Sequence, residues 1–541
     1  MKRILFHSNS AKAFTGFGKN AKNILQYLYK TGKYEIIEFA NGVQWDHPSL
    51  KLRPWKAQGS LPNNPAVIQQ LNKDPNRGRA AGYGAEMIDS AIKEYKPDIY
   101  IGVEDIWAFS DYWDKPWWNK INNMIWTTLD SQPILPQAAK AAPKTKHFYS
   151  WASFAEKDLK KMGHDHVGTL HGTVNTEDFY RQSDTYRKEL RREFGITDEF
   201  IIGFVFRNQL RKSVPNLLEG FKIFKKDCPN AKLLLHTHWS EGWDIPRLIE
   251  EKGLNKEDIL TTYYCSACGR YEVRSFVGQE QKCRFCGTEK SLNTTNVKSG
   301  VNEEQLNDIY NLMDVYCHPF TSGGMEIPIF EAKMAELVTL VTNYSCGEDS
   351  CTLESGSFSL DWSEYREPGT QFIKASTYPS SIAKQIKKVW RMSPEKRQEM
   401  GKKAKEWTIK NYSIEAVGKK LESILDNMPE INYDFDWSSK QNESVNLEDM
   451  LDDGNRIAVV MPESAGDVLW INSLMSNLKK LYPSYDIYVF TKTQFFDYIE
   501  DHPAVYKVLP YSQEIDNLHF LEGKQDHKGY FDMAFLPHYG T

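Results

Sequence analysis

Four cysteines are spaced so that their thiolates can converge on one metal ion. Cys265, Cys268, Cys283 and Cys286 form the pattern C-x2-C-x14-C-x2-C. Glycine follows each pair, as CSACG and CRFCG, and relieves strain where the backbone of such a knuckle bends. Four sulfur ligands with no open position are typical of a structural zinc site. Two disulfides are the alternative, which is disfavoured because a chain without a secretory signal should stay in a reducing compartment.

Two basic residues precede a helical stretch in FRNQLRKSVPNLLEGF. Arg207 and Lys212 lie five positions apart in the loop that follows an apolar run. An arginine fork and a mobile lysine are well suited to bind a diphosphate group, and a solvated basic turn is the alternative. Because cations in loops seldom determine stability, we expect their removal to impair function and to leave the fold intact.

A third candidate lies in HPFTSGGMEIPIFEAKMAELVTLVT, where a strand, a glycine turn and a helix follow one another. The backbone amides of Gly323, Gly324 and Met325 are placed to cradle a phosphate. Glu331, one turn into the helix, is placed to accept hydrogen bonds from ribose hydroxyls. Near the N-terminus, FTGFGKNAKNIL places Gly16 and Gly18 at the beginning of another helix, where the backbone can approach a phosphate or a sugar closely.

The elements that position these residues alternate between strands and helices. Apolar runs typical of buried parallel strands occupy residues 3–7, 34–39, 98–103, 124–128 and 147–149, then 200–206, 232–236, 315–318 and 338–342. Helical stretches include residues 19–31, 85–95, 214–226, 303–312 and 327–335, followed by 380–391, 394–411 and 413–426. This alternation predicts an α/β protein with two doubly wound, Rossmann-like domains that face a cleft.

The rest of the chain predicts a linker and a partial third α/β unit. Residues 427–454 are acidic and polar without a clear period, which is typical of a linker. Residues 455–541 then contain strands at 456–461 and 486–491, a helix that ends near 481, and an apolar run at 531–536. These are fewer strands than a complete doubly wound sheet has. Either the chain is truncated there, or another part of an assembly completes the sheet.

Taken together, these motifs resemble the large retaining family of GT-B glycosyltransferases that includes the phosphatidylinositol mannosyltransferases and the glycogen and sucrose synthase relatives. The family pattern is a "GR…KG" loop followed by "PS…EGFGLPxLEAMAxGxPV". Arg207 and Lys212 match the loop, and Pro328, Glu331 and Ala332 match the second motif. LHGTVNTEDF resembles the interdomain "NGVDxxxF". The resemblance covers about residues 1–426, and the four-cysteine segment, residues 262–296, is an insertion into it.

The resemblance implies a GT-B fold, with an acceptor domain at residues 1–172 and a nucleotide-sugar domain at residues 173–426. It implies a hexosyltransferase that moves a sugar from a nucleotide-diphosphate sugar with retention and without a catalytic metal. Arg207 and Lys212 would neutralise the leaving group, Glu331 would bind the ribose, and Gly16 and Gly18 would admit the donor. The acceptor stays open: a glycan, a protein, a small molecule or modified DNA.

Two departures from the family pattern bear on activity. Gly323 stands where the family has its first glutamate, and Glu326 lies three residues later, placed either to cap the helix or to contact the donor sugar. Asp130, in WTTLDSQP, stands where the family often presents a histidine near the donor sugar. Its carboxylate could bind sugar or acceptor hydroxyls, or it could cap a helix or turn. A catalytically inactive GT-B scaffold with a binding or assembly role is therefore the alternative function.

The third unit opens with RIAVVMPESAGDVLW, which resembles the beginning of the heptosyltransferase family. Gly466 and Asp467 match the "GD" that follows the first strand in that family. The segment that follows is too short to supply a complete donor domain. We therefore expect an incomplete transferase unit that acts as an interaction module and contacts another chain.

Bulk properties favour an ordinary soluble protein. The 541 residues correspond to about three or four domains. A net charge of −5 argues against a nucleic-acid binder that uses its whole surface. The apolar stretch in the N-terminal MKRILFHSNS is too short for a signal peptide. No run of about 18 apolar residues, the length needed for a membrane span, is present. We expect a cytoplasmic protein, in the host cytoplasm if the protein is viral.

Overall fold

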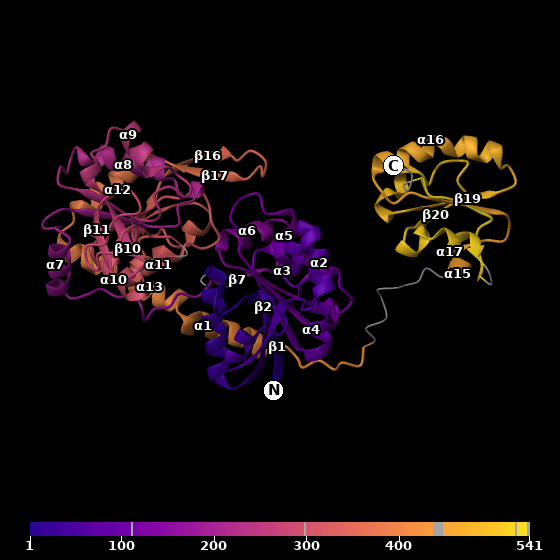
Figure 1. Cartoon of the computed structure of the whole chain (residues 1–541), viewed down its shortest axis with the longest axis horizontal. Coiled ribbons are helices and arrows are strands. Elements are labelled where there is room, and N and C mark those ends of the chain that lie inside the picture. The colour runs from indigo at the N-terminus through magenta and orange to yellow at the C-terminus, as the bar shows by residue number, and fades with distance from the viewer. Residues whose placement is uncertain (14, 110–111, 297–298, 436–446, 525–526, 538–541) are drawn as a thin grey trace. The chain divides into compact units, whose positions relative to one another are not determined.

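Contacts within the chain separate it into two units, Met1–Phe435 and Asp436–Thr541 (Figure 1). The computed structural model describes residues 1–13, 15–109, 112–296, 299–435, 447–524 and 527–537. The larger unit contains two parallel sheets, and the smaller unit contains a third. The α/β class predicted from the alternation of strands and helices is confirmed.

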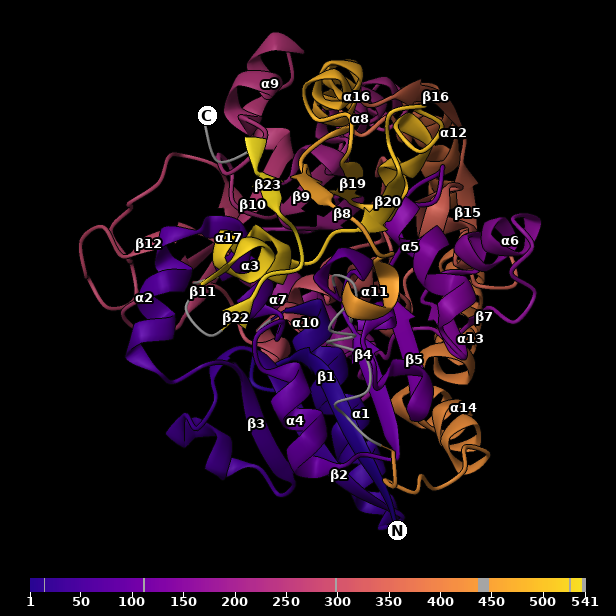
Figure 2. The same ribbon diagram turned by 90° about the vertical axis from the view of Figure 1, so that its right-hand side faces the viewer.

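The first sheet has seven parallel strands in the order β3-β2-β1-β4-β5-β6-β7 (Figure 2). Its strands are β1 (Lys2–Asn9), β2 (Tyr34–Gln44), β3 (Lys56–Leu61), β4 (Ile99–Val103), β5 (Asn122–Thr127), β6 (His147–Ser150) and β7 (Gly168–Thr169). The middle of β1 is buried on both faces, because Ile4, Leu5 and Phe6 all have zero exposure. Helices therefore cover both sides of this sheet, as expected for a doubly wound domain.

The helices of the first half are α1 (Gly16–Thr31), α2 (Pro65–Lys73), α3 (Pro75–Gly82), α4 (Ile88–Tyr95), α5 (Pro136–Ala141) and α6 (Ser153–Lys161). Helix α1 has well-defined ends. The hydroxyl of Thr15 accepts a hydrogen bond from the amide of Gly18 at its N-terminus, and Gly32 adopts a left-handed conformation just after its C-terminus. Its apolar face, with Ile24, Leu25 and Leu28, is buried in the core of the first sheet.

The second sheet has the strand order β11-β10-β9-β8-β13-β14-β15, and β12 pairs with β10. Its strands are β8 (Ile201–Val205), β9 (Lys232–His236), β10 (Ile259–Cys265), β11 (Tyr271–Ser275), β12 (Leu292–Thr294), β13 (Val315–His318), β14 (Thr339–Thr342) and β15 (Ser357–Leu360). Strands β11 and β12 are antiparallel to β10, and the remaining pairs are parallel. The second doubly wound domain thus carries an antiparallel extension at one edge.

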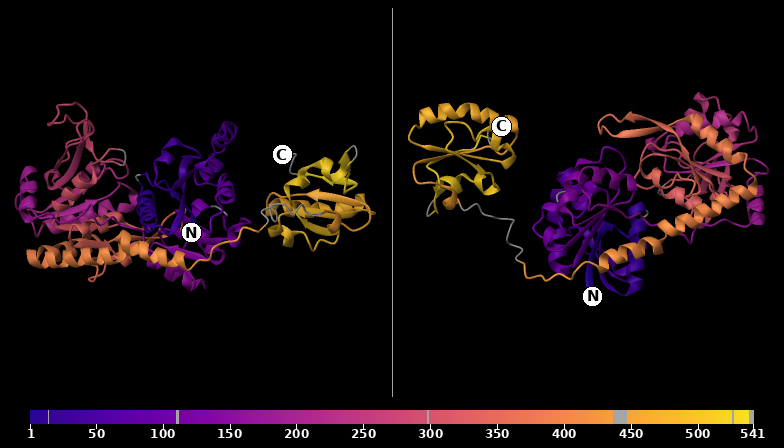
Figure 3. Two further views of the ribbon diagram at one scale, coloured as in Figure 1. Left: turned by 90° about the horizontal axis from the view of Figure 1, so that it is seen from below. Right: turned by 180° about the vertical axis from the view of Figure 1, so that it is seen from behind.

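The helices of the second half are α7 (Asp184–Glu193), α8 (Val214–Lys225), α9 (Ile245–Glu251), α10 (Glu303–Asn311), α11 (Ile327–Met334), α12 (Pro379–Trp390), α13 (Pro394–Tyr412) and α14 (Ile414–Asp426). Helices α13 and α14 run from the second sheet back to the first (Figure 3). There Val417, Leu421 and Leu425 of α14 join the core that α1 forms with the first sheet. This return of the chain joins the two halves into one unit.

A two-stranded hairpin that the sequence did not predict also connects the halves. It consists of β16 (Trp362–Arg366) and β17 (Ile373–Thr377), which pair antiparallel (Figure 1). The amide of Ile373 donates a hydrogen bond to the carbonyl of Gln132 in the first half, at 2.7 Å. The hairpin thus holds a loop of the first half against the second.

The described ends of the segment predicted as a linker pack against folded parts. The amide of Ile431 donates to Oδ1 of Asp98 at 2.8 Å, in the first half of the larger unit. Leu447, in a short helix α15 (Leu447–Met450), is buried in the core of the smaller unit. A backbone hydrogen bond holds the first of these ends, and an apolar side chain holds the second. Residues 436–446 of the predicted linker lie outside the described residues.

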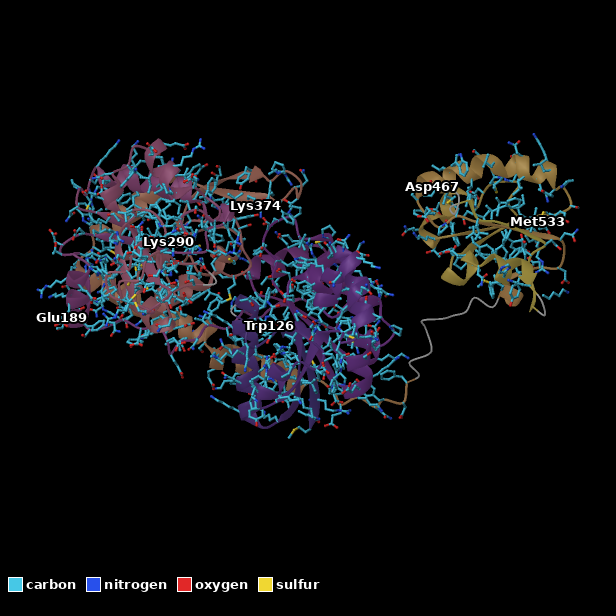
Figure 4. All side chains as sticks on the ribbon, in the orientation of Figure 1. Trp126, Glu189, Lys290, Lys374, Asp467 and Met533 are labelled. Atoms are coloured by element: carbon cyan, nitrogen blue, oxygen red, sulfur yellow. The ribbon has the colours of Figure 1, made fainter. Side chains whose placement is uncertain are left out.

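The smaller unit has a parallel sheet in the order β20-β19-β18-β23. Its elements are β18 (Arg456–Val460), α16 (Ala465–Leu481), β19 (Asp486–Thr491), β20 (Lys507–Pro510), α17 (Leu518–Glu522), β21 (Gly523–Lys524), β22 (His527–Lys528) and β23 (Met533–Phe535). Asp467, labelled in Figure 4, forms a capping box with Ser464 at the beginning of α16. Within the described residues, none of the helices combines the length and the hydropathy that a membrane crossing requires.

Candidate active site

The loops after β8 and β13 bring three side chains onto one buried carboxylate, that of Glu326. Arg211 contacts Oε1 of Glu326, and Lys212 contacts Oε2. Nε2 of His318, the last residue of β13, lies 3.0 Å from Oε2. Lys212, His318 and Glu326 are buried, whereas the side chain of Arg211 is 37% exposed. Three of the four side chains in the cluster are thus buried, and only that of Arg211 reaches the surface.

The charges in this cluster stabilise one another. Burial by itself would raise the pKa of Glu326, but the charges of Lys212 and Arg211 outweigh it and hold that pKa well below its usual range. Burial lowers the pKa of Lys212, and the charge of Glu326 opposes this shift. Burial also lowers the pKa of His318 to about 4, so that His318 is neutral at pH 7. At neutral pH the cluster therefore holds two cations and one anion.

The structure bears on two of the expectations about these residues. Lys212 is a buried partner of Glu326 rather than a solvated loop cation, so its removal should also cost stability. Glu326 precedes the first residue of α11, but its side chain makes no capping hydrogen bond with that helix, because its carboxylate is turned toward the cations. Arg211, which the motif did not single out, is the arginine that pairs with Glu326. Arg207 is exposed and lines a cleft of about 740 Å³.

The carboxylate of Glu326 fills the space beside Gly323. A Cβ atom at residue 323 would lie 2.6 Å from Oε1 of Glu326 and 3.1 Å from Nη1 of Arg211. Gly323 is not among the glycines with positive φ, so its backbone does not require glycine. A side chain at residue 323 would instead have to displace the carboxylate of Glu326. The carboxylate of Glu326 therefore lies directly beside residue 323, the position of the first glutamate in the family pattern.

The glycine turn touches the first half of the unit. A Cβ atom at Gly324 would lie 2.5 Å from Cβ of Thr128 and 2.8 Å from Oδ1 of Asp130, so the loop after β5 packs directly on this turn. The amide of Gly323 donates to Oγ of Ser345 at 3.1 Å. Of the three amides expected to cradle a phosphate, that of Gly323 is thus already engaged. Met325 packs its side chain against the first core.

Asp130, in the loop after β5, is an exposed residue whose carboxylate interacts with the charge of Arg211. Desolvation raises the pKa of Asp130, and the charge of Arg211 opposes that shift. Lys374, labelled on the hairpin in Figure 4, donates to Oγ of Ser131 at 2.9 Å and to Oγ of Ser322 at 2.7 Å. This lysine joins the Asp130 loop to the loop before the glycine turn. Lys374 was not singled out from the sequence, because the hairpin itself was not predicted.

Glu331 lies where two clefts meet. It is buried, its Oε2 accepts a hydrogen bond from the hydroxyl of Tyr310 at 2.8 Å, and burial raises its pKa. Glu331 lines both the cleft of about 740 Å³ and a neighbouring cleft of about 550 Å³. Lys19, from the first turn of α1, also lines both clefts. A carboxylate and a cation from opposite halves therefore face the same space.

The glycines at the beginning of α1 lie where the sequence predicted them. A Cβ atom at Gly18 would lie 2.3 Å from the carbonyl oxygen of Ala13, which excludes any other residue. A Cβ atom at Gly16 would lie 3.7 Å from Cδ1 of Ile327, the first residue of α11. The N-termini of α1 and α11 thus approach each other across the two halves, and both helix ends favour negative charge.

Two further carboxylates follow β4 and were missed in the sequence. Oε2 of Glu104 accepts from Nδ2 of Asn41 at 3.2 Å, and Oδ1 of Asp105 accepts from Oγ1 of Thr128 at 2.6 Å. Burial and the neighbouring charge of Asp105 raise the pKa of Glu104 to about 8. Their position just after the predicted strand at 98–103 was the available signal, since polar residues at the carboxyl ends of parallel strands face the cleft.

The four cysteines form a compact cluster in the antiparallel extension of the second sheet. Their sulfur atoms lie within 4.8 Å of one another, and the pairs Cys265–Cys286 and Cys268–Cys283 are each 3.8 Å apart. Tetrahedral zinc with Zn–S bonds of about 2.3 Å places its sulfurs about 3.8 Å apart, whereas a disulfide needs about 2.05 Å. All four are free thiols. The donor set therefore fits a structural zinc ion and not two disulfides.

The two knuckles have matching geometry, which supports this assignment. Gly269 and Gly287 both adopt left-handed conformations, with φ of 72° and 73°. Their amides donate to the carbonyls of Cys265 and Cys283, each at 2.9 Å. Only glycine adopts this conformation without strain, so the glycine after each cysteine pair is a requirement of the turn.

We expect one zinc ion per chain. Cys283→Ser should abolish zinc binding and loosen residues 262–296 while the parallel sheets stay folded, because strands β8, β9 and β13 do not depend on the metal ligands. Elemental analysis of reduced protein, with limited proteolysis of the variant, measures both effects. Reduced wild-type protein that contains no zinc would contradict the assignment.

No protein-family model matches the sequence, and a search of curated proteins finds no match. Several solved structures are similar to this chain. Sucrose-phosphate synthase from Thermosynechococcus elongatus has a TM-score of 0.54 at 13% identity, covering 79% of this chain and 98% of that one. A glycosyltransferase from Rickettsia africae ESF-5 has a TM-score of 0.53 at 15% identity, covering 79% and 98%. Alr3699/HepE from Anabaena, crystallised in complex with UDP, has a TM-score of 0.52 at 12% identity, covering 79% and 100%. The predicted GT-B fold is thereby confirmed.

Proposed function

We propose that this chain is a retaining glycosyltransferase that moves a hexosyl group from a nucleotide-diphosphate sugar to an acceptor hydroxyl. The observation that carries the proposal is the pair of cations, Arg211 and Lys212, held by Glu326 in the same loop as Arg207, which lines a cleft together with Glu331. Fixed cations near the leaving group are what the departure of a diphosphate requires. The similar structure from Rickettsia africae ESF-5 is a glycosyltransferase, and the one from Anabaena is a complex with UDP, which supports this reaction class.

In the proposed reaction the bond between the anomeric carbon and the diphosphate oxygen breaks, and a bond to the acceptor oxygen forms. The electron pair of the broken bond leaves with the diphosphate, and the proton of the acceptor hydroxyl passes to the departing diphosphate oxygen. Arg207, Arg211 and Lys212 would neutralise the departing charge, assisted by the amides of Gly324 and Met325. Because these groups are in place before reaction, they stabilise the developing charge with little reorganisation.

Glu326 acts in this proposal as a positioning residue. It is buried and contacts Lys212, Arg211 and His318, so it fixes the direction of both cations. The inactive scaffold was suggested by the missing glutamate at residue 323. A carboxylate that reaches the same space from residue 326 removes that argument and supports an active enzyme.

The remaining groups have roles in binding. Glu331 would accept hydrogen bonds from the ribose, and Gly16 and Gly18 would let the donor approach α1 closely. Asp130, with Glu104 and Asp105, would bind hydroxyl groups on the acceptor side. The acceptor is a glycan, a protein or modified DNA. Zinc, when bound, would brace the four-cysteine segment, and the reaction needs no catalytic metal in this proposal.

Donor screening tests the proposed reaction. Purified protein is incubated with UDP-, GDP- and ADP-sugars, and release of the nucleoside diphosphate is measured together with the melting temperature. We expect one donor to be consumed and the same donor to raise the melting temperature, since saturation at 100 Kd stabilises by about 2.7 kcal/mol. Neither consumption nor stabilisation by any donor would refute the proposal.

Glu331→Ala should weaken binding of the nucleoside diphosphate by about tenfold or more and change kcat much less. The variant loses a charged hydrogen-bond acceptor for the ribose but none of the groups that neutralise the leaving diphosphate. Calorimetric titration with UDP, GDP or ADP, whichever matches the consumed donor, measures the loss. Glu304→Ala, an exposed carboxylate in the first turn of α10, is the matched control and should bind as the wild type does. Unchanged affinity in Glu331→Ala would remove the ribose role.

A further inference from the structure

The four-cysteine segment is continuous with the second sheet, because both share strand β10. Residues Ile259–Thr261 of β10 pair parallel with β9, while Leu260–Tyr264 pair antiparallel with β11 and Tyr263–Cys265 with β12. One strand therefore belongs both to the Rossmann-like sheet and to the metal-binding ribbon, which we define as residues 259–294. The first cysteine ligand, Cys265, is the last residue of that strand. The ribbon consequently has a fixed position at the carboxyl end of the sheet, on the side where ligands bind in this class of fold.

The ribbon also forms part of the cleft that contains Arg207 and Glu331. Tyr264 and Gly269 of the ribbon line the cleft of about 740 Å³, together with Thr295 and Asn296 just beyond β12. His236, at the end of β9, lines the same cleft and lies 3.0 Å from Oγ1 of Thr262 and 3.5 Å from Oγ1 of Thr295. The metal-binding segment is thus a wall of the cleft.

The wall is fixed through the first cysteine knuckle. The amide of Gly269 donates to the carbonyl of Cys265, and the carbonyl of Gly269 accepts from Nε2 of Gln305 at 2.8 Å. Gln305 belongs to the capping box that begins α10, and the N-terminus of α10 itself lines the cleft. A chain of contacts therefore leads from a metal ligand, through one backbone turn, to the helix beside Glu331.

The base of the ribbon is held by aromatic packing. Trp239, in the loop after β9, stacks on Phe276 with ring centroids 4.3 Å apart. The hydroxyl of Tyr263 accepts from the amide of Val277 at 2.9 Å and donates to the carbonyl of Gly278 at 2.8 Å. These contacts hold the lower part of the ribbon on the sheet without the metal. The knuckle that ends at Gly269 depends more directly on the cysteines, because Cys265 and Cys268 are part of it.

We propose that the ribbon is the base-recognition wall of the nucleotide site: the ring of Tyr264 stacks on the nucleobase, and the knuckle at Gly269 sets the width of the base pocket. This inference rests on the proposed function. The ribbon side of the cleft offers a half-buried aromatic ring, hydroxyl and imidazole groups and backbone, whereas Arg207 and Glu331 supply the charges. A nucleobase is planar and uncharged, so it fits the first set, and its phosphates and ribose fit the second.

Calorimetric titration with UDP, GDP, ADP and inorganic pyrophosphate tests the inference. Tyr264→Ala should weaken the best-bound nucleotide about tenfold and leave pyrophosphate unchanged, because only the base loses its stacking partner. Tyr264→Phe keeps the ring and should bind as the wild type does. Cys283→Ser should change the order of preference among the three nucleotides. Lys282→Ala, an exposed ribbon residue paired with Glu289, is the control and should alter none of these values.

The outcomes separate the two proposals. Wild-type protein that binds none of the three nucleotides would refute the proposed function, and the ribbon inference with it. Nucleotide binding that Tyr264→Ala leaves unchanged, or that falls by the same factor as pyrophosphate binding, would overturn the ribbon inference alone. In that case the ribbon would serve only to support the fold.

Discussion

Glu326→Gln should lower kcat by about 100-fold or more, a loss of the size seen when a single preorganised electrostatic group is removed from an active site. Glutamine keeps the size of the side chain but removes the charge that directs Lys212 and Arg211. The variant should also melt at a lower temperature, because two neighbouring cations lose their counterion. Steady-state kinetics with the consumed donor and a thermal unfolding curve measure the two effects. A normal kcat would show that the cluster is structural only.

Transferring the glutamate from residue 326 to residue 323 tests whether a carboxylate can act from either position. Gly323→Glu alone should be inactive and unstable, because a side chain there meets Oε1 of Glu326 at 2.6 Å from Cβ. The double variant Gly323→Glu/Glu326→Gly removes that collision and restores a glutamate at the family position. We expect it to regain a substantial part of the activity that Glu326→Gly loses. A double variant no more active than Glu326→Gly would show that the two carboxylates are not interchangeable.

The fold could be predicted wherever burial leaves a pattern in the sequence. The runs at 232–236 and 315–318 coincide with β9 and β13, since strands buried on both faces are apolar throughout. The hairpin of β16 and β17 was missed for the opposite reason. Strand β16 is mostly exposed and carries no apolar alternation, and the hairpin is held by its own pairing and by the contact of Ile373 with Gln132. Contacts of that kind depend on distant residues and leave no local signal.

The sequence can indicate those site residues that belong to a short motif of neighbouring positions. It cannot indicate contacts between residues that are far apart in the chain. Arg207 and Glu331 line the cleft of about 740 Å³, whereas Lys212 is buried against Glu326. The partner of Glu326 was not predictable, because Arg211 and Arg207 stand in the same loop and only the fold shows which one turns toward the carboxylate. The sequence predicted His318 only as the last residue of a strand and did not indicate its contact with Glu326. Only the folded structure shows that the carboxylate of Glu326 lies beside Gly323. The sequence shows only that a glutamate stands three residues after the position of the family's first glutamate.

Lys212→Met should cost about 3–5 kcal/mol in the free energy of unfolding at neutral pH. The substitution leaves the buried carboxylate of Glu326 with Arg211 and His318 alone, and His318 is neutral at that pH. Denaturant unfolding of the full chain measures the cost. Lys160→Met is a matched control: this exposed lysine pairs with Glu156 one helical turn away, and its loss should cost about 0.5 kcal/mol or less.

The cost of Lys212→Met should depend on pH with a definite sign. The folded pKa of Glu326 is depressed, so the ion pair stabilises the protein above the unfolded pKa of about 4.3 and its contribution is lost as the pH falls through the folded value. The difference between wild type and Lys212→Met should therefore be largest near pH 7 and shrink in acid, where Glu326 becomes neutral in both proteins. Lys160→Met should show no comparable trend. A difference that stays constant or grows toward low pH would mean that Lys212 stabilises the fold by packing rather than by its charge.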